Sequence, residues 1–275
     1  MPDSALSPAV AWTLAALILL VALAVYGVQI RRLVSEGGKV DASRFDLPEL
    51  LVSLVLAGYF TFLTISPALT HGTKQTNINI DAVLPVSLFF IILVAGIAGF
   101  LSYRRLPLRQ VFGLDRVSLL PLLGWSLGLL AAAFPLLQAA NALAERALRG
   151  NVENQALVDL FNSAVHHHDY RAIGTIFLSA VCIQPACEEF LFRGFFYGIW
   201  KRYVGPIRSA LLASLLFAAF HNSLSAFAGL FVLAVCLNIA YERTGSLFVP
   251  ILMHALFNLT ELLLLFSLAQ LNAPR

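Results

Sequence analysis

Charged side chains are scarce in this chain. Asp, Glu, Lys and Arg make up 12% of its 275 residues, whereas soluble domains hold about 25%. Mean hydropathy is +0.83, and several apolar runs exceed the roughly 18 to 20 residues needed to cross a bilayer. These features exclude an ordinary water-soluble domain. They predict an all-α, polytopic membrane protein.

Cysteine is also rare. The three cysteines, Cys182, Cys187 and Cys236, lie in apolar segments without the paired spacing of a disulfide framework or a zinc ribbon. We interpret them as buried packing residues. The net charge of +3 comes from basic residues in short loops beside apolar runs, which membrane topology explains. We therefore expect the lipid bilayer as a partner and do not expect a nucleic acid.

Apolar runs predict about eight transmembrane helices. The first run is too long for a signal-peptide core and lacks a basic region before it, so it is expected to remain as a membrane helix. We predict an N-terminal four-helix region over 1–141, a polar loop over 142–171 and a C-terminal core over 172–270. The sixth span is short, which leaves its end at membrane depth or just beneath the surface. The spans are 8–30, 49–70, 81–102, 118–141, 172–200, 207–222, 224–241 and 246–270.

Basic residues indicate how these spans are oriented. Most of the 18 Lys and Arg residues fall between the first and second spans, the third and fourth, the fifth and sixth, and the seventh and eighth. Positively charged loops stay cytoplasmic, so both termini are expected on the opposite side, in a bacterial inner membrane or a plasma membrane. His166, His167 and His168 lie in the polar loop, where a run of histidines is more often solvated than metal-bound.

One apolar helix contains three charged residues within a short segment. Glu188, Glu189 and Arg193 lie inside the fifth span, although an ionisable side chain at bilayer depth is costly unless it is paired or faces a wet cavity. Glu189 and Arg193 are four residues apart, which predicts a supporting ion pair. Glu188 points about 100° away and lacks such a partner, which makes it a candidate reactive group. Alternatively, the three residues form one ion-paired cluster that only fixes helix packing.

Two later spans carry polar residues at a matching depth. His221 ends the sixth span, and His254 and Asn258 share one face of the eighth because they are four residues apart. Counted from the predicted cytoplasmic ends at about 1.5 Å per residue, Glu188 and both histidines reach the middle third of the membrane. A single histidine would more often be a packing residue. The presence of Glu188 and both histidines at one depth predicts an active site.

This set of side chains suits peptide hydrolysis. That reaction needs a base to take a proton from water, donors for the developing oxyanion and an acid for the leaving amine. Glu188 suits the first task, because burial makes a carboxylate a better proton acceptor, and His221 could hold the same water. His254 and Asn258 could donate hydrogen bonds to the oxyanion.

The same residues occur in motifs that resemble those of the CPBP family, which groups CaaX proteases with bacteriocin-processing proteins. The resemblance covers about residues 174–265. It implies an intramembrane glutamic endopeptidase in which Glu188 and His221 activate water while His254 and Asn258 form the oxyanion hole. The substrate would be a membrane-associated protein or peptide, either a prenylated CaaX protein or a bacteriocin or leader peptide. The motifs are Glu-Glu-x-x-x-Arg at 188–193, Phe-x-x-x-His at 217–221 and His-x-x-x-Asn at 254–258.

Three questions stay open at the level of sequence. The family has been described both with and without a metal, and Glu188, His221 and His254 would also make a plausible zinc site. We favour no cofactor, because Asn258 beside His254 suits a donor pair. A transporter with a Glu/His proton relay is an alternative function, although transporters usually show polar breaks in both halves. A non-catalytic immunity protein is another.

Overall fold

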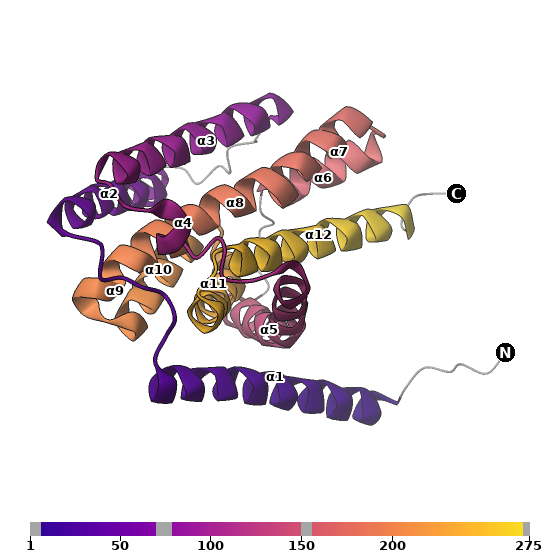
Figure 1. Cartoon of the computed structure of the whole chain (residues 1–275). Coiled ribbons are helices and arrows are strands. Elements are labelled where there is room, and N and C mark those ends of the chain that lie inside the picture. The colour runs from indigo at the N-terminus through magenta and orange to yellow at the C-terminus, as the bar shows by residue number, and fades with distance from the viewer. Residues whose placement is uncertain (1–6, 70–78, 150–155, 272–275) are drawn as a thin grey trace.

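The computed structural model describes residues 7–69, 79–149 and 156–271, and all regular secondary structure in these ranges is helical (Figure 1). Seven helical segments within these ranges are long and apolar enough to cross a membrane. The prediction of an all-α, multi-pass membrane protein is confirmed. The connection between the second and third predicted spans, 71–80, lies almost entirely outside the described residues.

The first four long helices extend further than their apolar runs. α1 begins after Ser7, whose hydroxyl accepts the Val10 N–H at 3.4 Å, and it continues through the basic residues to Glu36. Gly37, at φ +80°, ends it. Polar residues at both ends of a span stay helical at the membrane surface, which hydropathy alone does not reveal. The bounds are α1 Pro8–Glu36, α2 Leu47–Leu69, α3 Ile80–Tyr103 and α5 Leu119–Ala147.

The fifth span is a composite helix. It runs from Tyr170 to Val204 but contains two π-helical stretches, in which N–H groups donate to carbonyls five residues back. A short α-helix with Glu188 and Glu189 separates them. Its five segments are α7 Tyr170–Phe177, η1 Leu178–Ile183, α8 Gln184–Glu189, η2 Phe190–Tyr197 and α9 Gly198–Val204.

The last three helices complete the C-terminal core. They are α10 Pro206–Phe220, α11 Leu224–Thr244 and α12 Phe248–Leu271. The predicted sixth span is present as α10, but its 15 residues extend only about 22 Å. A hydrocarbon core is about 30 Å across. A helix of this length that began at one membrane surface would end, at His221, within the apolar layer.

Two short helices were not predicted. α4 covers Leu108–Val111, and α6 covers Ala156–His166 inside the region predicted as a polar loop. α6 is amphipathic: Phe161 and Val165 pack with Ile176 of α7 and Leu262 of α12. The 142–171 connection is thus partly folded onto the outer ends of the core helices, because its apolar residues recur at helical spacing.

The N-terminal helices pack directly on the C-terminal core. α5 lies against α11 and α12, and α1 covers α5 from the outside (Figure 1). At the other side, α2 and α3 contact α10 and the composite helix. The division into an N-terminal region and a core remains a prediction, since the two share these helix interfaces.

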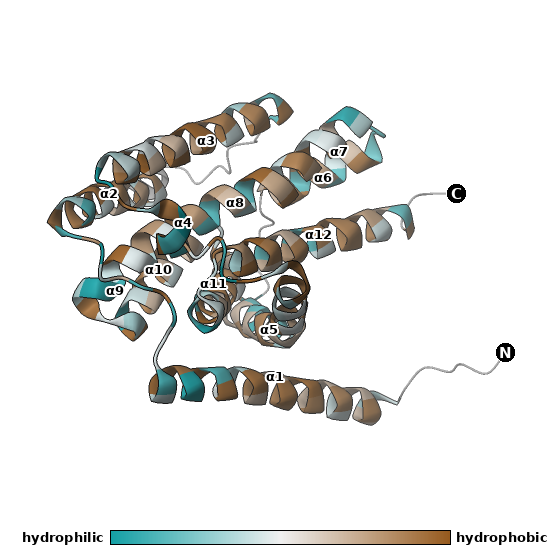
Figure 2. Cartoon of the chain, viewed as in Figure 1, coloured by the Kyte–Doolittle hydropathy of each residue, from teal (hydrophilic) through white to brown (hydrophobic). Residues whose placement is uncertain are grey.

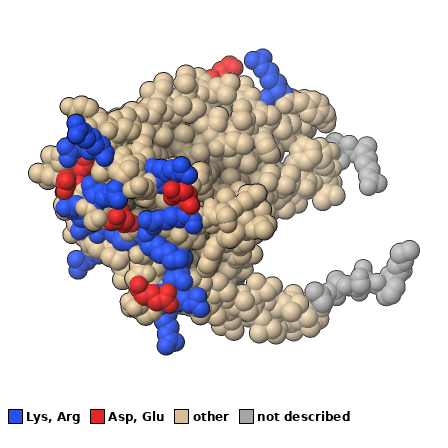
Figure 3. Space-filling model, viewed as in Figure 1, with Lys and Arg blue, Asp and Glu red and all other residues tan. Residues whose placement is uncertain are grey.

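The outward faces of the long helices are apolar, as expected for contact with lipid (Figure 2). In the face drawn in Figure 3, Lys and Arg gather at the end of the bundle where α4 and α9 lie. There, the Glu242 carboxylate of α11 accepts hydrogen bonds from Tyr197, from Lys201 at 2.5 Å and from the Val40 N–H at 3.3 Å. This buried carboxylate fastens the α1–α2 loop to the core.

Candidate active site

Glu188 lies between two histidines from different helices. Its Oε2 atom is 3.9 Å from Nε2 of His221 at the end of α10, and 4.0 Å from Nε2 of His254 on α12. This oxygen is buried and has no hydrogen-bond partner among the described residues. Distances of about 4 Å are too long for direct hydrogen bonds and leave room for one small polar molecule between the three groups.

The end of α10 fixes the orientation of His221. Its Nδ1 lies 2.8 Å from the Phe217 carbonyl oxygen, which can only accept, so Nδ1 carries the proton. In the neutral imidazole, the lone pair is then on Nε2, the atom that faces Glu188. The His221 side chain is 20% exposed, compared with 11% for Glu188 and 4% for His254, so it is the most accessible of these three groups.

His254 joins the two glutamates. Its Nδ1 lies 2.9 Å from Glu189 Oε1, which also accepts a 2.8 Å hydrogen bond from Arg193 Nη1. Glu189 and Arg193 form the ion pair that their spacing predicted, and both are fully buried. The contact between Glu189 and His254 was not predicted. Through this contact, the ion pair stabilises the position of His254 as well as the composite helix.

The Phe217 ring packs against Arg193 and both histidines. The Arg193 guanidinium carbon is 4.5 Å from the centre of its ring. The rings of His221 and His254 lie 4.6 and 5.8 Å from it, centre to centre. A cation over an aromatic face is stabilised electrostatically. One phenylalanine therefore packs against three of the predicted polar residues and fixes their positions relative to one another.

Asn258 is held by the π-helical break. The Gln184 N–H donates to the carbonyl of Ser179, five residues earlier, and the next residue, Pro185, has no N–H. The carbonyl of Ala180 therefore lacks the helical donor that the π register would give it. Asn258 supplies the replacement, since its Nδ2 donates to Ala180 at 2.7 Å.

The predicted zinc ligands do not form a zinc site as they stand. Tetrahedral zinc bound at about 2.0 to 2.2 Å places its ligand atoms about 3.3 to 3.6 Å apart, closer than the 3.9 and 4.0 Å that separate Glu188 from the two histidines. Among the residues that the structure describes, no three His, Cys, Asp or Glu side chains are grouped to hold a metal ion. The exposed run from His166 to His168 does not form such a group either.

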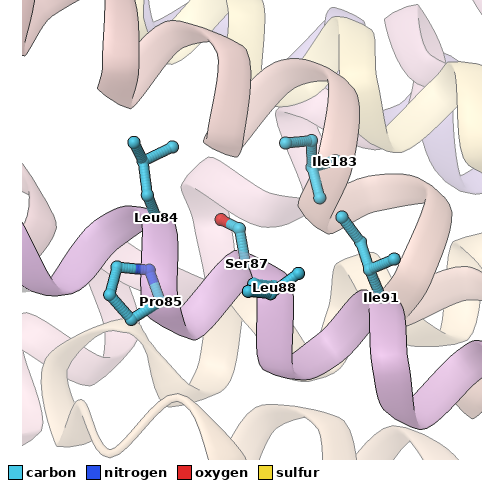
Figure 4. A pocket seen from close by; sticks show the side chains of 6 residues that line it. All are labelled: Leu84, Pro85, Ser87, Leu88, Ile91 and Ile183. Atoms are coloured by element: carbon cyan, nitrogen blue, oxygen red, sulfur yellow. The ribbon is translucent and has the colours of Figure 1, made fainter.

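An apolar hollow lies between α3 and η1. Its volume is about 430 Å³, and its lining comes from α3 and from one η1 residue (Figure 4). Ser87 of α3 forms a 2.8 Å hydrogen bond with Ser179 of η1, which joins the two helices beside it. This hollow is separate from the polar site. Its lining residues are Leu84, Pro85, Ser87, Leu88, Ile91 and Ile183.

Residues predicted from the sequence thus come together from three helices. Glu188, His221 and His254 meet, Glu189 pairs with Arg193, and Asn258 reaches the same composite helix one turn from His254. The support from Phe217 and Ala180 was not predicted. Pro185 inside an apolar run was the only sequence signal for a break in the helix, and it did not identify the carbonyl affected.

Comparisons with known proteins fall on this part of the chain. The model of the family described as "Type II CAAX prenyl endopeptidase Rce1-like" matches residues 171–260. This confirms the resemblance to CPBP proteases for the region that carries the site. An uncharacterized 24.3 kDa protein of Escherichia coli is 35% identical over 82 residues, which are 28% of this chain and 38% of that protein. The chain therefore spans well under half of that relative. No solved structure matches the chain.

Proposed function

We propose that this membrane protein is an endopeptidase that hydrolyses a peptide bond with a water molecule activated by Glu188. The observation that carries the proposal is the position of the buried Glu188 Oε2 between the Nε2 atoms of His221 and His254. In the described part of the chain, this oxygen has no hydrogen-bond partner. The similarity of residues 171–260 to a protease family supports the same class of reaction.

A single water fits the space beside Glu188. At about 2.8 Å from both Glu188 Oε2 and His221 Nε2, it would donate one hydrogen bond to each, at an angle of about 90°. Both acceptors would then hold the water by its protons. A lone pair would be left facing the substrate carbonyl, which is the arrangement that general base catalysis requires.

The reaction then follows with proton balance. The water oxygen bonds to the carbonyl carbon while one water proton passes to Glu188, and the carbonyl oxygen becomes an oxyanion. The carbon–nitrogen bond next breaks, the proton on Glu188 goes to the leaving amine, and a carboxylic acid product forms. Glu188 therefore acts as base and then as acid.

His254 and Asn258 are proposed to bind the oxyanion. Because His254 directs its Nδ1–H to Glu189, it can donate through Nε2 only as the doubly protonated imidazolium. Asn258 uses one N–H for Ala180 and retains the second for the substrate, since a carboxamide has two. No metal is required in this proposal; zinc is the alternative.

The proposed substrate is a membrane-associated protein or peptide. A prenylated CaaX protein is the candidate that the family description suggests, and a bacteriocin or leader peptide is the candidate that the motif resemblance adds. We also propose that both termini lie on the non-cytoplasmic side, because the charged end of the bundle carries most of the basic loops.

Substrate trapping tests the function. Wild-type protein and Glu188→Gln are expressed in membranes, and captured proteins are identified by mass spectrometry. We expect Glu188→Gln to retain membrane proteins that the wild type releases as two fragments. Cys187→Ala, which changes the residue next to Glu188, serves as the matched control and should behave as wild type. Intact recovery of every captured protein from the wild type would contradict the proposal.

A further inference from the structure

Gln184 has a buried side-chain oxygen with no hydrogen-bond partner among the described residues. The residue begins α8, four positions before Glu188, so both side chains project from the same face of the helix. A buried polar atom without a partner is costly and calls for an explanation. Beside a reactive carboxylate, the simplest explanation is a partner that arrives with the substrate.

The helix contacts show where Gln184 stands relative to the proposed oxyanion donors. Glu189 contacts His254, and Ala180 contacts Asn258. The composite helix and α12 therefore run antiparallel at the site. Gln184 lies between Ala180 and Glu189 along the chain, which places it level with the stretch of α12 that joins the two donors.

The chemistry that this oxygen recognises is an N–H group. A carbonyl oxygen only accepts hydrogen bonds. A peptide that enters the membrane must satisfy its own backbone N–H groups, because lipid offers no acceptors. The other groups of the site are committed in the proposed reaction, with Glu188 and His221 on the water and His254 and Asn258 on the oxyanion.

We propose that Gln184 is a substrate-positioning residue whose side-chain oxygen accepts a hydrogen bond from a backbone N–H beside the scissile bond. This inference rests on the proposed endopeptidase function and adds a substrate preference to it. The site would bind a backbone N–H of an extended peptide, so it would accept varied side chains. It would reject proline at one position, since proline has no N–H.

A backbone-ester scan tests the inference. A peptide captured with Glu188→Gln is synthesised in versions that replace one amide near the cleavage site by an ester, which removes a single N–H. For wild-type protein, we expect kcat/KM to fall about tenfold at one position. Gln184→Met should lower kcat/KM about tenfold on the all-amide peptide and show no further loss with that ester.

Two further variants keep the test decisive. Gln138→Met removes an exposed glutamine from α5 and should keep the wild-type ester profile. If Gln184→Met fails to fold, Gln184→Asn, which withdraws the oxygen by one methylene, should show a reduced response to the same ester.

The outcomes separate this inference from the proposed function. An ester profile of the Gln184 variants identical to that of the wild type would overturn the inference while leaving the endopeptidase in place. If the wild type cleaves none of the captured peptides, or if cleavage survives Glu188→Gln, the proposed function is wrong and the inference falls with it.

Discussion

Asn258 of α12 donates a 2.7 Å hydrogen bond to the carbonyl oxygen of Ala180, in the π-helical stretch that precedes the two glutamates. The bond ties the last helix to the break in the fifth span. It gives Asn258 a structural role in addition to the proposed oxyanion contact, so the two roles need to be separated by experiment.

We predict that Asn258→Ala lowers both activity and stability. Loss of one oxyanion donor should reduce kcat about 10² to 10³-fold, and the Ala180 carbonyl would be left without a side-chain donor, which costs about 1 to 3 kcal/mol. Initial rates and thermal unfolding in detergent measure the two effects.

Pro185→Ala restores an N–H near Ala180. In that background we expect a smaller loss of stability from Asn258→Ala but the same loss of rate. If Pro185→Ala restored the rate of the Asn258→Ala protein as fully as its stability, the role of Asn258 would be structural only.

Glu188 and His221 should be essential for the chemical step. Glu188→Gln is expected to lose most activity, since an amide cannot accept the water proton, and His221→Ala should be comparably damaging. Cys187→Ala should retain activity because neighbouring helical residues point about 100° apart, which leaves the thiol without a base to activate it. Rates of peptide cleavage at equal folded concentration decide this. A fully active Glu188→Gln protein would exclude the mechanism.

Arg193 should support folding as well as activity. Removing it would leave the Glu189 carboxylate buried and uncompensated, which costs about 3 to 5 kcal/mol. We therefore expect Arg193→Ala to reduce folded yield and to disturb His254, which shares the same carboxylate oxygen. Arg109→Ala is a control, because Arg109 and Asp115 form an exposed ion pair and such pairs contribute little. Normal yield and activity of Arg193→Ala would make the buried pair dispensable.

Chelator treatment decides whether a metal takes part. Purified protein should keep its activity after prolonged exposure to a strong chelator, because the proposed nucleophile is a water held by Glu188 and His221. Activity that is lost with the chelator and restored by zinc would replace this mechanism with a metal-dependent one. The endopeptidase assignment and the same side chains would survive that result.

Hydropathy predicted the membrane-spanning helices better than their ends. The apolar runs located all of the long helices, but α1 continues six residues beyond its predicted end, from 31 to Glu36. Amphipathic α6 was missed because its apolar face docks on protein rather than spanning lipid. Burial within an assembled bundle is a tertiary property, so a single-sequence reading cannot distinguish such a helix from a polar loop.

Local spacing predicted some contacts of the site and missed those made across helices. The pair of Glu189 and Arg193 follows from four-residue spacing, as does the shared face of His254 and Asn258. The contacts of Glu189 with His254 and of Asn258 with Ala180 depend on how α12 is placed against the composite helix. That placement follows from packing and from the π register, which no local pattern specifies.

Because α10 is short, we expect the candidate site to be sensitive to the lipid around it. Because this helix ends at His221 after 15 residues, polar groups and water have to reach inward on that side, and the distance they cover depends on acyl-chain length. A thicker bilayer imposes a larger hydrophobic mismatch and a longer path for the water that the proposed hydrolysis would consume. Membrane composition would thus set the supply of the second substrate, independently of how well the peptide binds.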